Sequence, residues 1–433
     1  MKKIITFLGT NNYEEIIYTY TNEEGKEFEV KTRLVQEAIS EIVGKDAIIY
    51  VCLTDRARET NWIDRIEVKV DRKTGEKREV FYYGLKPRLE SKNIKYEELP
   101  LRDGANNEEM WENFGRIFDI FEEGDEVYFD VTHSFRSIPF IVMSVLNYAK
   151  FIKNIEIKSI YYGAFKAMKD GKAPIFNLSI FNQITDWTIG AERFISTGDS
   201  KQLSNMIETT IQPILRKQNK DKGDKDDEEA RVVNRIRSSL KNFSEGLYTV
   251  RGSKTSNYGT TLKKALESIK EINIDELKPF EKILDKIYEK VHFYSNDIIL
   301  DVHNTVKLCR DLNLIQQAYT YLQENIISYL CVKANMDLYD EDLRMDISRV
   351  IPHYRSHDRL ELSQELLELN ERLKPYISSD LADLYKDLGD FRNDINHGGY
   401  RKNPRRYSTF YENLDDFILK FESIVFNANA SNN

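Results

Sequence analysis

The chain has 433 residues, enough for two or three domains with a substantial core. Hydrophobic residues make up 41% and charged residues 31% of it, which is typical of a soluble folded protein, and no apolar run approaches the roughly 20 residues that span a bilayer. The net charge of -9 argues against a broad electrostatic grip on long nucleic acid, but it leaves room for a local basic pocket.

The cysteines and the N-terminal segment indicate the cellular compartment of the protein. Cys52, Cys309 and Cys331 are too few and too widely spaced for a disulfide framework or a CxxC metal site, so we expect a reducing cytoplasm. The first 13 residues carry two lysines and the short apolar run IITFL, with no small-residue cleavage site after it. This segment therefore predicts a first β-strand and not a signal peptide.

The first 165 residues alternate between strand-like and helix-like patterns. Buried strands are expected at 3–9, 46–54, 125–133 and 155–165. Helices are expected at 33–44, 108–124 and 137–154, and a hairpin is expected at 16–32. The segment 69–83 is expected to form another hairpin or an exposed excursion. Strands separated by helices indicate an α/β domain with a mainly parallel sheet and crossover helices, a Rossmann-like layer fold.

Strand signals fade after about residue 182, and the rest of the chain predicts helices. Apolar residues recur at helical spacing in 312–332, 362–373, 380–397 and 414–426. The charged run 217–230 has no apolar positions, so we expect a solvated loop or helix surface there. The sequence thus predicts a Rossmann-like domain at 1–185, a helical connector at 186–310 and a compact all-α domain at 311–433.

Polar residues follow the first predicted strand in the stretch GTNNY. Gly9 allows a tight turn, and Thr10, Asn11 and Asn12 offer hydroxyl, amide and backbone donors. Ligands of a doubly wound sheet bind beyond the carboxyl ends of its strands, which is where this loop lies. When this loop is considered alone, a well-capped strand–helix turn explains it better than a binding site.

The stretch DVTHSFRSIPF follows a later core strand and enters a helix. Thr132, His133, Ser134 and Arg136 cluster there, while Ser137 could cap the helix and Pro139 lies in its first turn. Hydroxyls, an arginine and helix N-terminal amides suit a phosphate. The added histidine and arginine favour a binding site over a simple capped turn. Neither GxGxxG nor GxxxxGK[ST] occurs, which disfavours a dinucleotide or P-loop site.

The stretch FRNDINHGG near the C-terminus places Arg392 five residues before His397. Residues at this spacing point about 140° apart on a straight helix, so the two side chains do not share a face. Asn393 does share one with His397, at i and i+4, and could orient the imidazole. Gly398 and Gly399 then end the helix. An arginine and a histidine suit phosphodiester chemistry, because one holds the phosphate while the other moves a proton.

A basic segment follows this helix end. Arg401, Lys402, Arg405 and Arg406 could hold a short piece of RNA. The alternative is a capping histidine beside a surface arginine, and the spacing by itself does not decide between the two. His292, His303, His353 and His357 form no metal-ligand pattern, so no metal is expected.

These motifs resemble a known family. GTNNY after the first strand and DVTHSFRSIP after a later one resemble a CARF domain, and RNDINH in a C-terminal helical domain resembles the Arg-x4-6-His motif of a HEPN domain. Together and in this order they resemble the CARF–HEPN ribonucleases of type III CRISPR systems. The resemblance covers both ends of the chain, whereas about 186–310 matches only loosely.

The resemblance implies a mechanism. Two CARF domains would pair and bind a cyclic oligoadenylate, here expected to be cyclic tetra-adenylate, although the residues do not define its ring size. The implied activator-binding residues are Gly9, Thr10, Asn11, Asn12, Thr132, His133, Ser134 and Arg136. Two HEPN domains would pair and cleave single-stranded RNA without metal, by attack of the ribose 2′-OH on the adjacent phosphate. The implied catalytic residues are Arg392, Asn393 and His397.

The resulting expectation is a cytoplasmic endoribonuclease of antiviral defence that is activated by cyclic oligoadenylate and forms a homodimer or a higher homo-oligomer. One alternative is a non-catalytic CARF sensor whose helical half binds a partner or nucleic acid. A second is a HEPN nuclease without ligand control. The sequence also leaves open whether the CARF domain cleaves its own activator.

Overall fold

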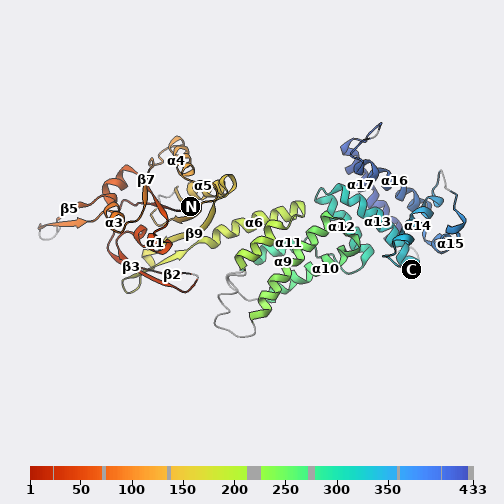
Figure 1. Cartoon of the computed structure of the whole chain (residues 1–433), viewed down its shortest axis with the longest axis horizontal. Helices are drawn as coiled ribbons and strands as arrows, with labels where there is room; N and C mark the ends of the chain where they lie inside the picture. Colours follow the sequence, from red (N-terminus) through yellow and green to blue (C-terminus); the bar gives the residue numbers. More distant parts are fainter. Residues whose placement is uncertain are drawn as a thin grey trace. The chain divides into compact units, whose positions relative to one another are not determined.

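The computed structural model describes residues 1–22, 24–70, 75–133, 138–211, 226–271, 278–357, 361–400 and 402–427 (Figure 1). The chain divides into two compact units, Met1–Gln183 and Ile184–Asn433. Of the charged run 217–230, residues 217–225 lie outside the described part.

The N-terminal unit contains an eight-stranded sheet. Its strands, in the order in which they lie, are β3 (Glu27–Thr32), β2 (Ile16–Thr21), β10 (Lys172–Asn177), β9 (Glu156–Gly163), β8 (Glu126–Asp130), β1 (Lys2–Phe7), β4 (Ile48–Leu53) and β7 (Tyr96–Pro100). Five of the seven neighbouring pairs are parallel, and the pairs β10–β9 and β2–β3 are antiparallel. The mainly parallel Rossmann-like fold expected from the sequence is therefore confirmed.

Helices cover both faces of the sheet and create two separate cores. They are α1 (Val35–Val43), α2 (Asp55–Ala57), α3 (Leu85–Ser91), α4 (Asn107–Asp119) and α5 (Ile138–Lys153), with the short segments η1 (Arg58–Trp62) and η2 (Phe165–Ala167). Ile4 of β1 packs in a core with α1 and α3, whereas its neighbour Ile5 packs in a second core with α4 and α5. Alternate side chains of a strand point to opposite faces, so a central strand must be apolar on both.

The sequence did not predict two of the strands. β7 lies at the sheet edge and has two glutamates in the middle of its five residues, exposed Glu97 and partly buried Glu98, so it has no apolar run. β10 contains Pro174, which lowers its strand signal, and it enters the sheet between β2 and β9. The expected strand at 155–165 ends at Gly163, and Phe165 belongs to η2.

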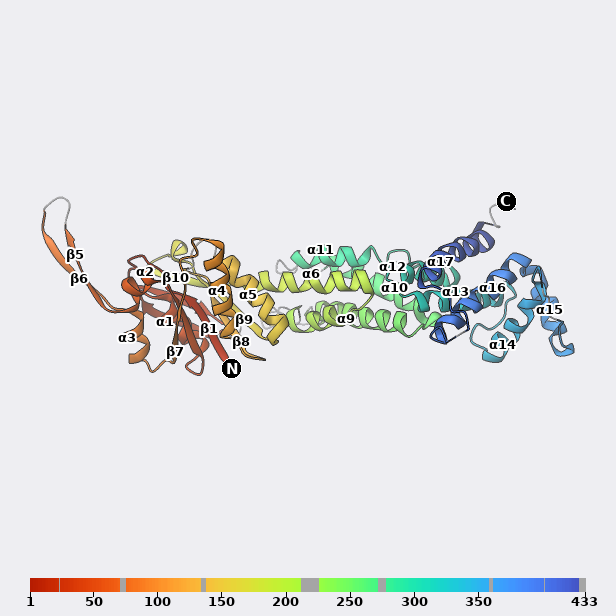
Figure 2. The same ribbon diagram turned by 90° about the horizontal axis from the view of Figure 1, so that it is seen from above.

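A second, two-stranded sheet forms from β5 (Arg65–Val70) and β6 (Lys77–Tyr82), as the hairpin expected at 69–83 partly predicted. Figures 1 and 2 show these strands projecting from the rest of the N-terminal unit. Ile66, Val68 and Phe81 are more than half exposed on it. The base of this hairpin contacts the loop after β1, as described below.

The described residues of the second unit form helices and no strand. The long helices are α6 (Ser179–Thr197, which begins before the unit boundary), α9 (Asp226–Tyr248), α10 (Gly252–Ser268), α11 (Lys278–Tyr288), α12 (Ile298–Asp311), α13 (Ile315–Lys333), α14 (Glu341–Val350), α16 (Ser379–Asn396) and α17 (Tyr407–Glu422). Shorter segments are α7 (Lys201–Met206), η3 (Ile207–Ile211), η4 (Ile269–Glu271), η6 (Ile351–Tyr354), η7 (Gln364–Leu366), α15 (Leu367–Leu373), η8 (Lys374–Tyr376) and η9 (Ser423–Asn427). None of the described helices combines the length and apolar character needed to cross a bilayer.

An aromatic cluster holds α13, α16 and α17 together. Tyr319 of α13 stacks on Phe391 of α16, with ring centroids 5.6 Å apart, and Phe410 and Phe417 of α17 meet both rings edge-on. The Tyr319 hydroxyl donates to the carbonyl of Phe410 over 2.8 Å. This cluster fixes the buried face of α16 and hence which of its side chains face outward.

Candidate functional site

The loops after β1 and β8 meet because these strands are parallel neighbours, with Thr6 opposite Asp130. Asp130 is fully buried and accepts hydrogen bonds from the Thr6 hydroxyl at 2.6 Å and the Thr132 amide at 2.9 Å. Burial raises the pKa of this carboxyl above its ordinary value. Asp130 therefore ties the start of the second loop to the central strand.

A pocket of about 490 Å³ opens at this edge of the sheet. The residues that line it are Asn11, Asn12, Tyr13, Glu14, Tyr18, Thr132, His133, Tyr162, Gly163, Phe165 and Lys166. Four of the predicted ligand-binding residues, Asn11, Asn12, Thr132 and His133, thus lie around one cavity. Ser134, Arg136 and Ser137 fall outside the described residues.

His133 is the most unusual polar group of this pocket. Its ring stacks on Tyr13, with centroids 4.2 Å apart and planes inclined by 27°. Its buried Nε2 has no hydrogen-bond partner among the described residues. Burial lowers the pKa of His133 to about 4, so the ring is neutral at pH 7. A neutral imidazole with a free nitrogen can donate or accept one hydrogen bond to a ligand.

Gly9 does not line this pocket, but it makes room for Tyr13 and His133, which do. A Cβ at position 9 would lie 1.8 Å from the Tyr13 hydroxyl and 3.2 Å from Cβ of His133. Only glycine therefore leaves room for the stacked pair. Thr10, also expected to bind ligand, is not among the lining residues.

The first loop is held by buried polar contacts. The amide nitrogen of Asn61 donates to the carbonyls of Gly9 at 2.8 Å and Asn11 at 2.9 Å. Arg33, itself buried, donates to the side-chain oxygen of Asn61 and to the carbonyl of Tyr13. These contacts fix the backbone that presents Asn11 to the pocket.

Asn12 has its side chain engaged elsewhere. Its amide nitrogen donates to Glu67 over 2.9 Å and its oxygen accepts from Arg65, both on β5. A ligand that used the Asn12 side chain would have to displace the base of the β5–β6 hairpin. In this conformation Asn12 links the pocket to that hairpin.

The second candidate site is the end of α16. The backbone amides of His397, Gly398 and Gly399 donate to the carbonyls of Asn393, Ile395 and Asp394. Gly398 and Gly399 have φ values of 62° and 72°, which favour glycine. His397 is the last residue before this reversal, and its side chain and that of Asn393 are exposed. The helix end predicted from the two glycines is therefore present.

Arg392 lies on a different side of α16. It is half-buried, and its Nε is buried without a hydrogen-bond partner in the described part of the chain. The positive charge of Arg392 acts on Tyr385, two turns earlier, whose pKa is raised mainly by burial and also by Glu324. No hydrogen bond joins Arg392 to His397 among the described residues, as expected from the angle between them.

In the basic segment after α16, one arginine is bound to the helix and two other basic residues are exposed. Arg405 forms an ion pair with the buried carboxylate of Asp394 at 3.2 Å and lies over the Phe391 ring at 4.2 Å. This expected RNA-binding residue therefore braces α16 in the present conformation. Lys402 and Arg406 are exposed, and Arg401 lies outside the described residues.

In the described part of the chain, no group of three or more acidic, histidine or cysteine side chains lies close enough together to hold a metal ion. Cys52, Cys309 and Cys331 are all buried and unpaired.

Comparison with known proteins identifies the N-terminal unit. Residues 3–166 match the family model of the CARF domain of CRISPR system endoribonuclease Csx1. The N-terminal unit therefore contains a CARF domain of the Csx1 type. Residues 183–294 match the model of the second domain of CRISPR-associated protein MJ1674. CARF domains as a class bind cyclic oligoadenylates, so the pocket after β1 and β8 lies where a ligand of this CARF domain is expected.

One curated relative is also described as CRISPR-associated. CRISPR-associated protein MJ1674 of Methanocaldococcus jannaschii is 36% identical over 121 residues, which make up 27% of this chain and 19% of the relative. The chain thus matches about a fifth of the length of that protein. Residues 295–433, which include Arg392 and His397, lie outside both matched family ranges.

Sequence reasoning missed the third segment of the CARF pocket. Tyr162, Gly163, Phe165 and Lys166 follow or end β9, the parallel neighbour of β8. Among the described residues that line the pocket, Lys166 is the only lysine or arginine and Glu14 is the only aspartate or glutamate. The sequence predicts one continuous strand over 155–165, whereas β9 ends at Gly163, at the same edge of the sheet as β1 and β8.

Proposed function

We propose that the chain is a cyclic-oligoadenylate-activated, metal-independent endoribonuclease of type III CRISPR defence, acting on single-stranded RNA as a homodimer. The observation that carries this proposal is the combination, in one chain, of a Csx1-type CARF pocket and a helix end that exposes His397 and Asn393 five and one residues after Arg392.

The CARF pocket suits an adenylate ring. Lys166 attracts phosphate, while His133, Thr132 and Asn11 offer hydrogen-bonding groups for bases or ribose hydroxyls. Phe165 is 48% exposed and offers a face for base stacking. A pocket of about 490 Å³ holds only part of a cyclic tetra-adenylate, which fits a ring shared by two CARF domains.

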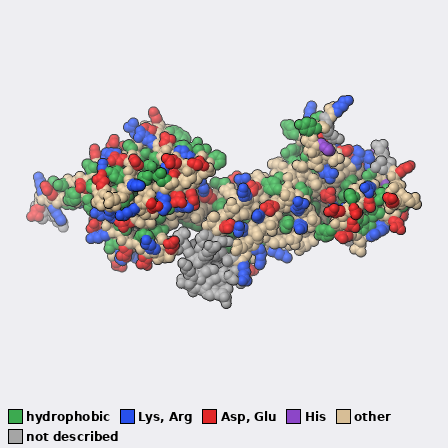
Figure 3. All heavy atoms as spheres, in the orientation of Figure 1, with side chains coloured by type: hydrophobic (Ala, Val, Ile, Leu, Met, Phe, Trp, Pro, Cys, Tyr) green, Lys and Arg blue, Asp and Glu red, His purple; other side chains and the backbone are tan. Residues whose placement is uncertain are grey.

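Pairing of two chains is supported by an apolar surface on the CARF domain. Phe140 and Phe151 of α5 are 78% and 82% exposed, and Trp111 of α4 is 71% exposed. Figure 3 shows hydrophobic side chains gathered over α4 and α5. Large exposed apolar side chains that lie together are typical of a protein–protein interface.

Cleavage would occur where two copies of the α16 end meet. The 2′-oxygen of a ribose attacks the adjacent phosphorus as the bond from phosphorus to the 5′-oxygen breaks, which leaves a 2′,3′-cyclic phosphate and a 5′-hydroxyl. His397 of one chain moves a proton between these oxygens, and Arg392 holds the phosphate. The Nε of Arg392 supports this role, since it is a buried donor without an acceptor among the described residues.

The test is RNA cleavage in EDTA with a panel of cyclic oligoadenylates. Wild-type protein should cut single-stranded RNA, faster with cyclic tetra-adenylate, and His397→Ala should lower the rate by at least about a hundredfold. His292→Ala is the matched control, because His292 is also an exposed histidine. Cleavage that survives His397→Ala would disprove the site assignment.

A non-catalytic CARF sensor is the second candidate. It is favoured by the ion pair of Arg405 with Asp394, which removes a cation from the expected RNA surface, and by the position of Arg392 away from His397. A protein that binds activator tightly but cuts no RNA under any condition of the panel would support this candidate.

A further inference from the structure

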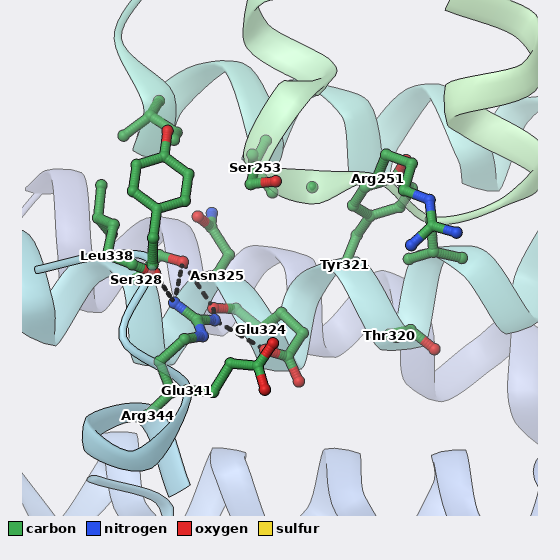
Figure 4. Close-up of a pocket in the computed structure, with 15 residues that line it drawn as sticks. Arg251, Ser253, Thr320, Tyr321, Glu324, Asn325, Ser328, Leu338, Glu341 and Arg344 are labelled. Carbon is green, nitrogen blue, oxygen red and sulfur yellow. Dashed lines mark hydrogen bonds and ion pairs between the residues drawn. The ribbon is translucent and has the colours of Figure 1, made fainter.

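A second pocket, of about 510 Å³, lies entirely within the helical unit (Figure 4). It is bordered by the start of α10, the start of α12, the middle of α13, and the segment from Leu338 into α14. It shares no residue with the CARF pocket or with the end of α16. Its volume is that of a pocket for a ligand of small-molecule size.

One side of this pocket is positively polarised. α10 is a 17-residue helix that begins at Gly252 after Arg251, which provides no side-chain cap. The backbone amides of Gly252 and Ser253 donate no hydrogen bond to any described residue, and both residues line the pocket. The Arg251 side chain also lines it and forms no ion pair with any described residue. Free amides, a helix dipole and a guanidinium together suit a phosphate.

A buried acceptor provides a second, independent observation. Asn325 of α13 is 1% exposed and lines the pocket. Its amide nitrogen donates to the carbonyl of Ile299 over 3.0 Å, which fixes the orientation of the side chain. Its oxygen has no hydrogen-bond partner in the described part of the chain. Figure 4 shows this amide pointing from α13 into the space that Ser253 borders. Because buried acceptors are normally hydrogen-bonded, this oxygen can accept a hydrogen bond from an N–H or O–H group of a ligand.

The remaining lining groups define the ligand further. Glu324 is paired with Arg344 at 2.7 Å, whereas Glu341 forms no ion pair with a described residue and can accept a hydrogen bond. Tyr339 is 65% exposed and offers an aromatic face. The pocket thus combines an anion site, acceptors for amine or hydroxyl donors, and a surface for stacking a flat ring.

We propose that this pocket binds a 5′-ribonucleotide, with its phosphate at the start of α10 beside Arg251 and with donors of its base or ribose at Asn325 and Glu341. The same chemistry is present in a free mononucleotide and in the phosphorylated 5′ end of an RNA strand. The proposal does not depend on cleavage activity or on the CARF ligand.

The test is calorimetric titration of the full chain with adenosine 5′-monophosphate, 5′-phosphorylated tetra-adenylate, the same oligomer without its phosphate, and inorganic phosphate. Ser253→Asp should weaken binding of the phosphorylated ligands by at least about tenfold, because it places a negative charge beside the phosphate. The same carboxylate in the first turn favours the helix, so the thermal midpoint should not fall. Arg251→Ala should weaken binding as well, whereas Lys264→Ala, an exposed cation of α10 that does not line the pocket, should not.

The outcomes separate the sources of the ligand and the two pockets. Binding of the mononucleotide supports a free nucleotide, and binding of only the phosphorylated oligomer supports an RNA end. Binding that Ser253→Asp leaves unchanged, that Lys166→Ala in the CARF pocket abolishes, or that is absent for every phosphorylated ligand would overturn the proposal.

Discussion

The two candidate sites differ in how much of each a single chain supplies. The CARF pocket is assembled within one chain, because parallel strands deliver their following loops to one edge of the sheet. The end of α16 presents Arg392 and His397 on different sides of a helix, with no hydrogen bond between them among the described residues. A sheet edge can gather distant residues, whereas a lone helix end needs a second surface to complete a site.

The largest effect is expected from mixing two inactive proteins. Arg392→Ala and His397→Ala should each lower RNA cleavage by at least about a hundredfold. Mixed and reassociated, they should regain about a quarter of the wild-type rate, since half of the dimers are mixed and each restores one of two Arg–His pairings. The measurement is cleavage of a fluorogenic single-stranded RNA with saturating activator. A mixture as inactive as its components would show that the site does not combine Arg392 of one chain with His397 of the other.

The next largest effect is expected on ligand binding in the CARF pocket, which a single chain supplies. Lys166→Ala should weaken binding of cyclic tetra-adenylate by about tenfold or more, because it removes a charge-assisted contact to phosphate. The measurement is a binding titration with labelled ligand. Lys169→Ala removes a nearby exposed lysine that does not line the pocket and should leave affinity unchanged. Equal losses in the two variants would indicate a general charge effect.

A smaller effect, on stability, is expected from a substitution of Gly9, which packs against two pocket residues. Gly9→Ala places a methyl group 1.8 Å from the Tyr13 hydroxyl, so the Tyr13–His133 stack must move. The free energy of unfolding should fall by about 1–3 kcal/mol, and activator affinity should fall with it. Gly115→Ala, on α4 with nothing within 4 Å, is the control and should be neutral or slightly stabilising. Denaturant unfolding measures the stability of the two variants and of wild type. Equal stability of wild type and Gly9→Ala would contradict the tight packing.

The smallest effect is a pH dependence of stability. The pKa of His133 is lowered to about 4, so between about pH 6.5 and 4 the unfolded chain binds a proton that the folded chain does not. Stability contributed by the neutral ring should therefore be lost as pH falls through this range. His133→Gln should show a smaller drop in thermal midpoint between pH 7 and 5 than wild type. The raised pKa of Asp130 acts in both proteins, so the difference isolates His133. An identical drop would contradict a buried neutral histidine.

The sequence predicted those parts of the molecule that follow from local pattern. β1 and β8 are apolar runs ended by polar residues, and Gly398 with Gly399 mark the end of α16, so these features were recognisable. The pairing of Asn12 with β5 and of Arg405 with Asp394 was not, because each joins residues whose contact depends on tertiary structure. Lys166 was missed for a similar reason, since its role depends on where β9 stops.

The place of β10 in the sheet has a consequence for synthesis and folding. β2 and β3 are made early, yet they join the sheet through β10, which pairs with β2 on one side and β9 on the other. Tyr18 of β2 and Lys166 just before β10 both line the CARF pocket. A ribosome must therefore release the chain beyond residue 177 before the pocket can close, so ligand binding would report that the whole N-terminal unit has finished folding.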